Sequence, residues 1–203
     1  MKLRDGDVGV FKLAAGALMI MAFATGALVV LPYFTLRNAP APDGLNPYTE
    51  QQLRGRQSYI ANGCIYCHSQ QPRDPAVAPD MARGWGRPSV PGDYVYDRPH
   101  LLGTMRTGPD LFNIAVRQPS RDWHLGHLYQ PRAYSPGSIM PAFPYLFERK
   151  RGTALANEVI VSLPPAFARD GERVVATQEA LDLTAYLLSL DRSYPVRKTS
   201  AVP

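Results

Sequence analysis

The sequence predicts an all-α protein with long irregular loops, in which one transmembrane helix near the N-terminus tethers a soluble domain. Three observations support this fold class. One long uncharged run is followed by stretches in which apolar residues recur at helical spacing, and alternating strand patterns are almost absent. Proline is also frequent, with 20 among 203 residues, which is typical of long loops. We therefore divide the chain into an anchor (1–37), a linker (38–46), a folded domain (47–192) and a tail (193–203).

Composition excludes several other classes of protein. Hydrophobic residues make up 45% of the chain, which is too few for a membrane protein with many spans. Two cysteines cannot form a framework of several disulfides. The net charge of +5 is modest for this length, so we expect no nucleic acid among the partners.

The apolar run covers residues 13–36 and lies between Lys12 and Arg37. Its 24 residues exceed the ~20 that a helix needs to cross a bilayer. A cleaved signal peptide is the alternative, because residues 22–24 resemble a small-residue cleavage site. The apolar residues continue well past the ~7–15 that form the core of a signal peptide, so we expect an uncleaved anchor.

Basic residues indicate how this anchor crosses the membrane. Lys2, Arg4 and Lys12 precede the run, and only Arg37 follows it closely. The excess of basic residues before the run predicts a cytoplasmic N-terminus. We therefore expect a single-pass protein of the cytoplasmic membrane, with its folded domain on the periplasmic side.

Four stretches of the folded domain have a helical pattern: residues 48–61, 121–129, 148–163 and 177–190. Ser120 is a suitable N-cap for the second stretch, and the last one has a wide apolar stripe. Residues 69–108 are rich in proline, glycine and aspartate and predict irregular structure, with one short extended piece at 94–96. Three prolines prevent a continuous helix over 135–144.

The motif Cys-x-x-Cys-His is formed by Cys64, Cys67 and His68. Two thiols three residues apart can reach one edge of a porphyrin, and the imidazole that follows can lie under its iron. This is the attachment signature of a c-type haem, so we expect one covalent haem c. The alternatives are weaker: zinc needs further ligands at short spacing, a redox dithiol needs a βαβ context, and a disulfide here would close too short a loop.

The second axial ligand determines what such a haem can do. An open position permits gas binding or peroxide chemistry, whereas a methionine thioether gives an electron carrier. Met140 is the best candidate, because Pro141 favours an extended backbone before it and Pro144 stiffens the same loop. Met105 or a histidine is a weaker candidate, and Met140 as simple core filler is the remaining alternative.

Residues 108–111 read Gly-Pro-Asp-Leu and lie between these two elements. Alone they indicate only a turn, but beside a haem the Pro109 carbonyl can accept the Nδ1–H of His68 and fix its ring. His124 and His127 share one face of a predicted helix. Two imidazoles without a third ligand make a copper or zinc site a poor interpretation, and packing against a partner or a haem propionate is a better one.

These elements, closed by the helix expected over 177–190, resemble a class I cytochrome c. More specific stretches lie at residues 84–99, 106–111, 123–128 and 140–144, which read GWGRPSVPGDYVYDRP, RTGPDL, WHLGHL and MPAFP. Together they resemble the monohaem subunit, subunit II, of cbb3-type cytochrome c oxidases. The resemblance covers the anchor and roughly residues 48–145.

The resemblance implies a membrane-embedded haem–copper catalytic subunit that reduces oxygen, usually a second cytochrome c subunit, and an electron-donor cytochrome. It assigns six residues to one haem c: Cys64 and Cys67 as attachment points, His68 and Met140 as iron ligands, and Arg106 and Pro109 as surroundings. The chain would relay single electrons and perform no substrate chemistry. Competing functions are the cytochrome c subunit of a nitric oxide reductase, a free-standing anchored carrier, and a gas sensor or peroxidase with an open iron.

Overall fold

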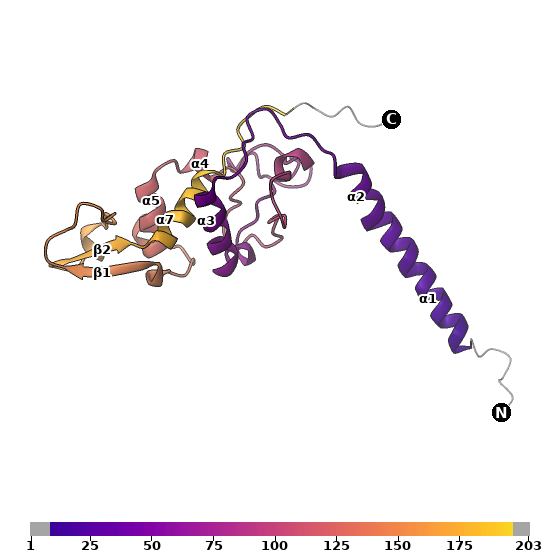
Figure 1. Cartoon of the computed structure of the whole chain (residues 1–203), viewed down its shortest axis with the longest axis horizontal. Coiled ribbons are helices and arrows are strands. Elements are labelled where there is room, and N and C mark those ends of the chain that lie inside the picture. Colours follow the sequence, from indigo (N-terminus) through magenta and orange to yellow (C-terminus); the bar gives the residue numbers. More distant parts are fainter. Residues whose placement is uncertain (1–8, 197–203) are drawn as a thin grey trace. The chain divides into compact units, whose positions relative to one another are not determined.

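The computed structural model describes residues 9–196, and the chain divides into two compact units, one up to Ala41 and the other from Pro42. The first unit contains a continuous helical segment made of α1 (Val10–Thr25), a π-helical turn (Gly26–Val30) and α2 (Leu31–Leu36) (Figure 1). Pro32 lacks an N–H, and its ring would clash with the preceding turn of a regular α-helix. The wider π-helical turn lies at this place, so the helix continues through the proline.

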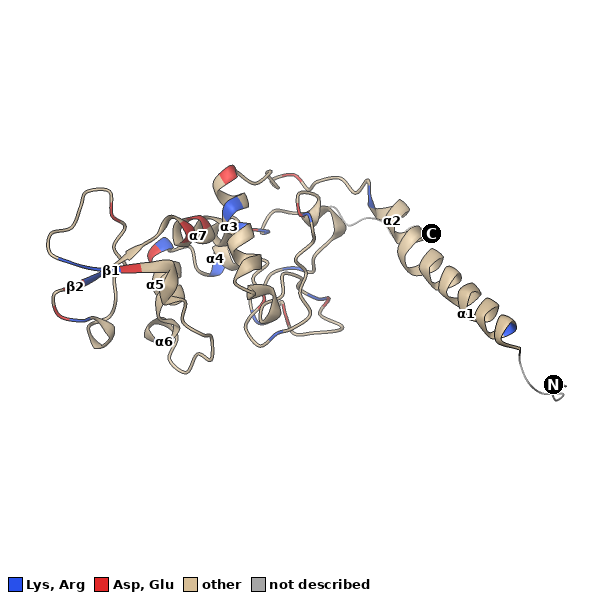
Figure 2. Ribbon diagram, turned by 60° about the horizontal axis from the view of Figure 1, so that its bottom comes forward, with Lys and Arg blue, Asp and Glu red and all other residues tan. Residues whose placement is uncertain are grey.

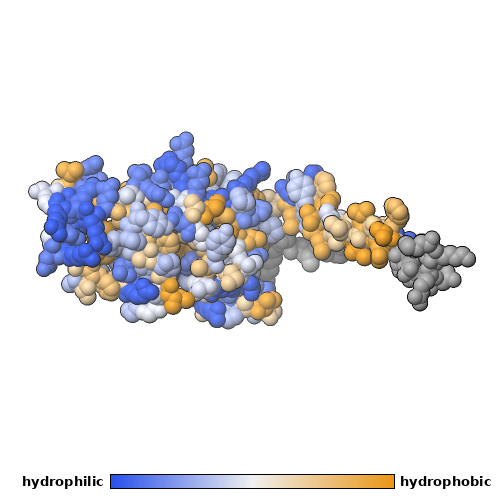
Figure 3. Space-filling model, turned by 90° about the horizontal axis from the view of Figure 1, so that it is seen from below, coloured by the Kyte–Doolittle hydropathy of each residue, from blue (hydrophilic) through white to orange (hydrophobic). Residues whose placement is uncertain are grey.

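This segment is long and apolar enough to cross a membrane. Its 27 residues span about 40 Å at 1.5 Å per residue, more than the ~30 Å of a bilayer core. Figure 3 shows the apolar side chains that cover it. The segment begins three residues before the predicted run and ends at the same residue. Lys2 and Arg4, on which the predicted orientation depends, lie outside the described residues, as does the end of the predicted tail.

The second unit is mainly helical and irregular, with one two-stranded sheet in its described part. Its regular elements are α3 (Glu50–Ala61), α4 (Ile114–Arg117), α5 (Arg121–Tyr129), α6 (Pro131–Tyr134), β1 (Phe147–Arg151), β2 (Glu172–Ala176) and α7 (Gln178–Leu188). Helices α3 and α7 pack together across Gly55. A Cβ at this position would lie 1.8 Å from the carbonyl oxygen of Asp182, so only glycine permits this close approach.

Side-chain caps determine where three of the predicted helices begin. Thr49 and Gln52 form a capping box before α3, and Thr177 accepts a backbone N–H at the start of α7. Ser120 accepts the N–H of Trp123, which confirms the predicted cap and bounds of α5. The helical predictions for these three stretches are therefore confirmed to within two residues.

Two local predictions are wrong. Residues 148–163 do not form a helix, because β1 pairs with β2 in antiparallel register, with Phe147 opposite Ala176, and the chain after β1 is irregular. This long-range pairing outweighs the helical preference of the local sequence. Residues 94–96 are not extended either. A 3₁₀ helix spans Pro91–Tyr94, because the Asp93 carboxylate accepts the Val90 N–H at 2.7 Å.

The irregular segment over 69–108 is held by buried ion pairs rather than by secondary structure. Basic and acidic residues lie close together along these loops (Figure 2). The pairs join Asp80 to Arg106 at 2.5 Å, Asp93 to Arg87 at 2.6 Å and Asp97 to Arg56 at 3.1 Å. All three aspartates are buried, and a buried carboxylate needs such a partner. The segment therefore has a defined fold that can form one wall of a site.

Candidate haem site

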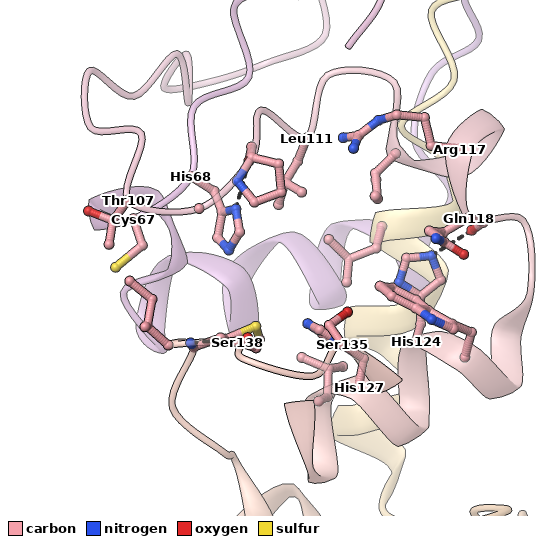
Figure 4. Close-up of a pocket in the computed structure, with 18 of the residues that line it drawn as sticks. Cys67, His68, Thr107, Leu111, Arg117, Gln118, His124, His127, Ser135 and Ser138 are labelled. Atoms are coloured by element: carbon pink, nitrogen blue, oxygen red, sulfur yellow. Dashed lines mark hydrogen bonds between the residues drawn. The ribbon is translucent and has the colours of Figure 1, made fainter. Parts of the chain in front are cut away.

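A cavity of about 550 Å³ lies in the second unit, beside the Cys-x-x-Cys-His motif (Figure 4). Residues from the motif, from the Gly-Pro-Asp-Leu turn, from α5 and from the loop before β1 line it together. The walls are mostly apolar, with a few polar groups at defined places. Its volume is in the range of about 300–1,000 Å³ that is usual for sites of cofactor size.

His68 is oriented by one hydrogen bond. Its Nδ1 lies 2.8 Å from the carbonyl oxygen of Pro109, so Nδ1 carries the proton and donates it (Figure 4). Burial lowers the pKa of His68 and favours the neutral ring. The lone pair of Nε2 is then free to bind a metal. This is the arrangement of a histidine ligand whose second nitrogen is fixed by an outer partner.

Gly108 makes room for this ring. A Cβ on Gly108 would lie 2.3 Å from Cε1 and 2.7 Å from Nδ1 of His68, far inside van der Waals contact. The N–H of Gly108 also donates to the carbonyl of Cys67 at 2.9 Å. The imidazole therefore packs directly on the backbone before Pro109. In the sequence this glycine indicates only part of a turn, and no local signal indicates the contact.

Asp110 joins the two loops that hold His68 and Pro109. Its buried carboxylate accepts the hydroxyl of Ser69 at 2.6 Å and the N–H groups of Gln71 and Phe112, each at 2.8 Å. Burial raises the pKa of this carboxyl group, and these hydrogen bonds oppose the rise. This role was not predicted, and its only signal in the sequence is a polar residue that directly follows Pro109.

Met140 lines the same cavity as His68, and it packs partly buried against the core. Two hydrogen bonds fix its loop: the N–H of Met140 donates to Ser138 Oγ at 3.2 Å, and the N–H of Phe143 donates to the carbonyl of Leu128 at 2.9 Å. The fold therefore brings an imidazole nitrogen and a thioether sulfur to one cavity. A haem iron accepts such a donor pair.

The two cysteines differ in their positions. Cys67 lines the cavity, whereas Cys64 packs partly buried against the core beside it. Both thiols are free, and burial raises the pKa of Cys64 to about 11, so it stays protonated at neutral pH. Two free thiols, a histidine and a methionine around a cavity of this size fit one c-type haem.

A family model described as the mono-haem subunit of cytochrome c oxidase, FixO, matches residues 9–187. The match includes the apolar helix and most of the second unit. The chain belongs to this family. The resemblance to the monohaem subunit of cbb3-type oxidases is thereby confirmed. No curated protein matches the chain.

As an oxidase subunit of this family, the protein carries one haem, takes part in electron transfer and associates with the catalytic subunit. Its apolar N-terminal helix fits single-pass anchoring in the membrane. The mono-haem subunit is therefore a component of a terminal oxidase.

Arg106 of the mono-haem subunit lies outside the cavity lining. Its guanidinium contacts Asp80 at 2.5 Å, donates to the carbonyl of Gln71 at 2.8 Å and lies 3.9 Å from Asp110. The same guanidinium packs over the ring of Trp85, at 5.3 Å from the centroid. Arg106 thus holds the irregular segment against the loop that carries His68. Met105, the alternative ligand, is 55% exposed and also lies outside the lining.

Helix α5 of the mono-haem subunit contributes three rings to the cavity wall. His124 Nε2 lies 2.9 Å from the carbonyl oxygen of Gln118, and the ring of His127 stacks on Trp123 at a centroid distance of 4.5 Å. Burial lowers the pKa of both histidines to about 4, so both are neutral at physiological pH. Across residues 9–196, no cluster of three His, Cys, Asp or Glu side chains could hold a metal ion.

Proposed function

We propose that the mono-haem subunit relays single electrons through one haem c, bound covalently by Cys64 and Cys67 and ligated at its iron by His68 and Met140. The observation that carries this proposal is the meeting of His68 and Met140 at one cavity, beside the Cys-x-x-Cys-His motif. When bound, the haem supplies reversible one-electron chemistry at its iron.

The chain's own residues orient the ligands and keep water out. The carbonyl of Pro109 fixes the ring of His68, and Gly108 leaves the space in which that ring lies. Apolar residues such as Leu111, Ile114 and Leu128 line the cavity and exclude water from it. With His68 and Met140 both holding the iron, no coordination position would be left for a substrate. The chain therefore carries electrons and performs no substrate chemistry.

The location and partners belong to the same proposal. The anchor (1–37) holds the protein in the cytoplasmic membrane with its N-terminus inside, and the linker (38–46) leads to the haem domain on the periplasmic side. Electrons arrive from a donor cytochrome or from a second cytochrome c subunit and pass to the haem–copper catalytic subunit. Purification of the full chain in mild detergent tests this assembly. A second cytochrome c should remain with the complex, and a lone chain would contradict the proposal.

Removal of the sulfur ligand tests the haem ligation. In the reduced Met140→Ala protein, carbon monoxide should bind rapidly, and the midpoint potential should fall, because a thioether raises the potential of haem iron. The sulfur-to-iron charge-transfer band of the oxidised protein should disappear. Met105→Ala is the matched control, since this methionine is exposed outside the cavity. If Met105→Ala produces these changes and Met140→Ala does not, the assignment of the ligand is wrong.

A further inference from the structure

Arg117 is an arginine of the cavity wall without an acidic partner. Four other half-buried or buried arginines of the described residues pair with a carboxylate: Arg56 with Asp97, Arg87 with Asp93, Arg106 with Asp80 and Arg173 with Glu158. Buried Arg192 forms no ion pair, but its guanidinium donates to the carbonyls of Ser189 and Asp191 and to the hydroxyl of Tyr48. No ion pair within residues 9–196 includes Arg117. Its Nη2 donates to the backbone carbonyl of Asp110, and its buried Nε has no partner. A half-buried cation in this state lacks a counter-ion.

His127 is a second polar group of the wall with an incomplete set of partners. Its Nδ1 is buried and makes no hydrogen bond within the described residues. The neutral ring avoids a buried, unpaired donor when it carries its proton on Nε2. The ring plane is fixed, because it lies within 12° of the plane of Trp123. His127 therefore offers an N–H donor on a rigid support, and it lines the same cavity as Arg117.

Arg117 lies away from the attachment motif. In Figure 4, Cys67 lies at one end of the cavity, and Arg117, Gln118 and His124 lie at the other. A porphyrin that is attached through its vinyl groups carries its two propionate carboxylates on a different edge. A carboxylate in the cavity would supply the counter-ion that Arg117 lacks and an acceptor for the Nε2–H of His127, and a porphyrin carries such carboxylates as its propionates.

We propose that Arg117 and His127 bind the haem propionates, with Arg117 as a counter-ion and His127 as a hydrogen-bond donor. This inference rests on the proposed function, because it requires a haem in the cavity. Arg117 is then a positioning residue that also acts on the potential. The negative charge of a propionate favours the oxidised iron, and a cation beside it offsets this charge. Removal of the positive charge of Arg117 therefore lowers the midpoint potential.

The experiment uses the full chain, matured with haem and purified in detergent, and compares Arg117→Gln with Arg117→Lys and His127→Phe. Phenylalanine keeps the stacking on Trp123 and removes the donor. Arg121→Gln is the matched control for charge, because Arg121 is an exposed residue in the first turn of α5, and His100→Gln controls for loss of an exposed imidazole. Haem content, midpoint potential and the propionate modes in resonance Raman spectra are measured for each protein.

We expect normal haem content in all variants. Arg117→Gln should lower the potential well beyond the shift in Arg121→Gln and should move the propionate modes. Arg117→Lys should restore most of the potential, and His127→Phe should move the modes with a smaller change in potential. If the Gln variant fails to fold, the Lys and Phe variants carry the same spectroscopic comparison. Propionate modes and potentials equal to those of the controls would overturn the inference. Wild-type protein without covalent haem would instead overturn the proposed function.

Discussion

Substitution of Gly108 by alanine tests the most crowded contact of the site. The new Cβ would lie 2.3 Å from Cε1 of His68, and ordinary van der Waals contact begins at 3.4 Å, so one group must move by about 1 Å. The backbone of Gly108 is not in the left-handed region, so alanine adds no backbone strain. The movement must separate His68 from the carbonyl of Pro109, because Pro109 directly follows the substituted residue.

The magnitude follows from two terms. Overpacking a close contact costs about 1–3 kcal/mol. Loss of the hydrogen bond between Nδ1 and the Pro109 carbonyl costs about 0.5–1.5 kcal/mol. We therefore expect the free energy of unfolding of the haem-containing protein to fall by ~1.5–4.5 kcal/mol. The midpoint potential should also change, because the hydrogen bond governs the electron density on the histidine ligand.

Denaturant unfolding and redox titration measure the two effects. Gly171→Ala is the control, because Gly171 has φ +70° and no heavy atom within 4 Å of an added Cβ. That variant loses stability through backbone strain alone, and its haem spectrum and potential should remain those of the wild type. A Gly108→Ala protein with the wild-type potential, and with stability within ~0.5 kcal/mol of the wild type, would refute the contact between Gly108 and His68.

Three further predictions concern other parts of the molecule. Arg106→Leu leaves the buried Asp80 without its partner, so the free energy of unfolding, measured with denaturant, should fall by about 3 kcal/mol or more. The haem spectrum should not change. A changed spectrum with full stability would instead place Arg106 at the haem. The ion pair with Arg173 lowers the pKa of Glu158 to about 2, so the stability that this pair contributes should be present above pH ~4.5 and lost towards pH 2. Glu158→Gln should remove the loss of thermal stability between pH ~4.5 and pH 2 that comes from this ion pair. If the variant and the wild type show the same dependence of stability on pH, the prediction is wrong. The intact mass of the purified protein should include the apolar helix, whereas cleavage after Ala24 would identify a signal peptide.

The helices that the sequence predicts correctly are determined by local features. Helix α5 combines an N-cap at Ser120 with apolar residues at helical spacing, and α7 does the same after Thr177. Strand β1 is different, because its partner β2 begins 21 residues after β1 ends. Nothing in Phe147–Arg151 indicates that partner, and Glu148 and Lys150 are good helix formers. Strand pairing over this separation cannot be read from a local pattern.

The same distinction applies to the site. Residues that react are recognisable from their chemistry, and the sequence indicates Cys64, Cys67 and His68 from type and spacing alone. Residues that support them are recognisable only from contacts. Gly108 matters because an imidazole from a segment 40 residues earlier lies on it, and Arg117 matters because no carboxylate within the described part of the chain pairs with it. The first kind of residue can therefore be predicted from the sequence, and the second kind cannot.

The buried carboxylate of Asp110 has a structural role beside the haem motif. His68 and Pro109 both lie on loops, where no helix or strand fixes the distance between them. Asp110 strengthens the backbone hydrogen bonds that join these loops, since its carboxylate accepts hydrogen bonds from Ser69 and Gln71 on the motif side. The cost of burying this charge is offset only while these bonds persist, because an unpaired buried carboxylate is strongly disfavoured. The Asp110 carboxylate therefore helps to keep the 2.8 Å distance between His68 and the Pro109 carbonyl, although it does not line the cavity.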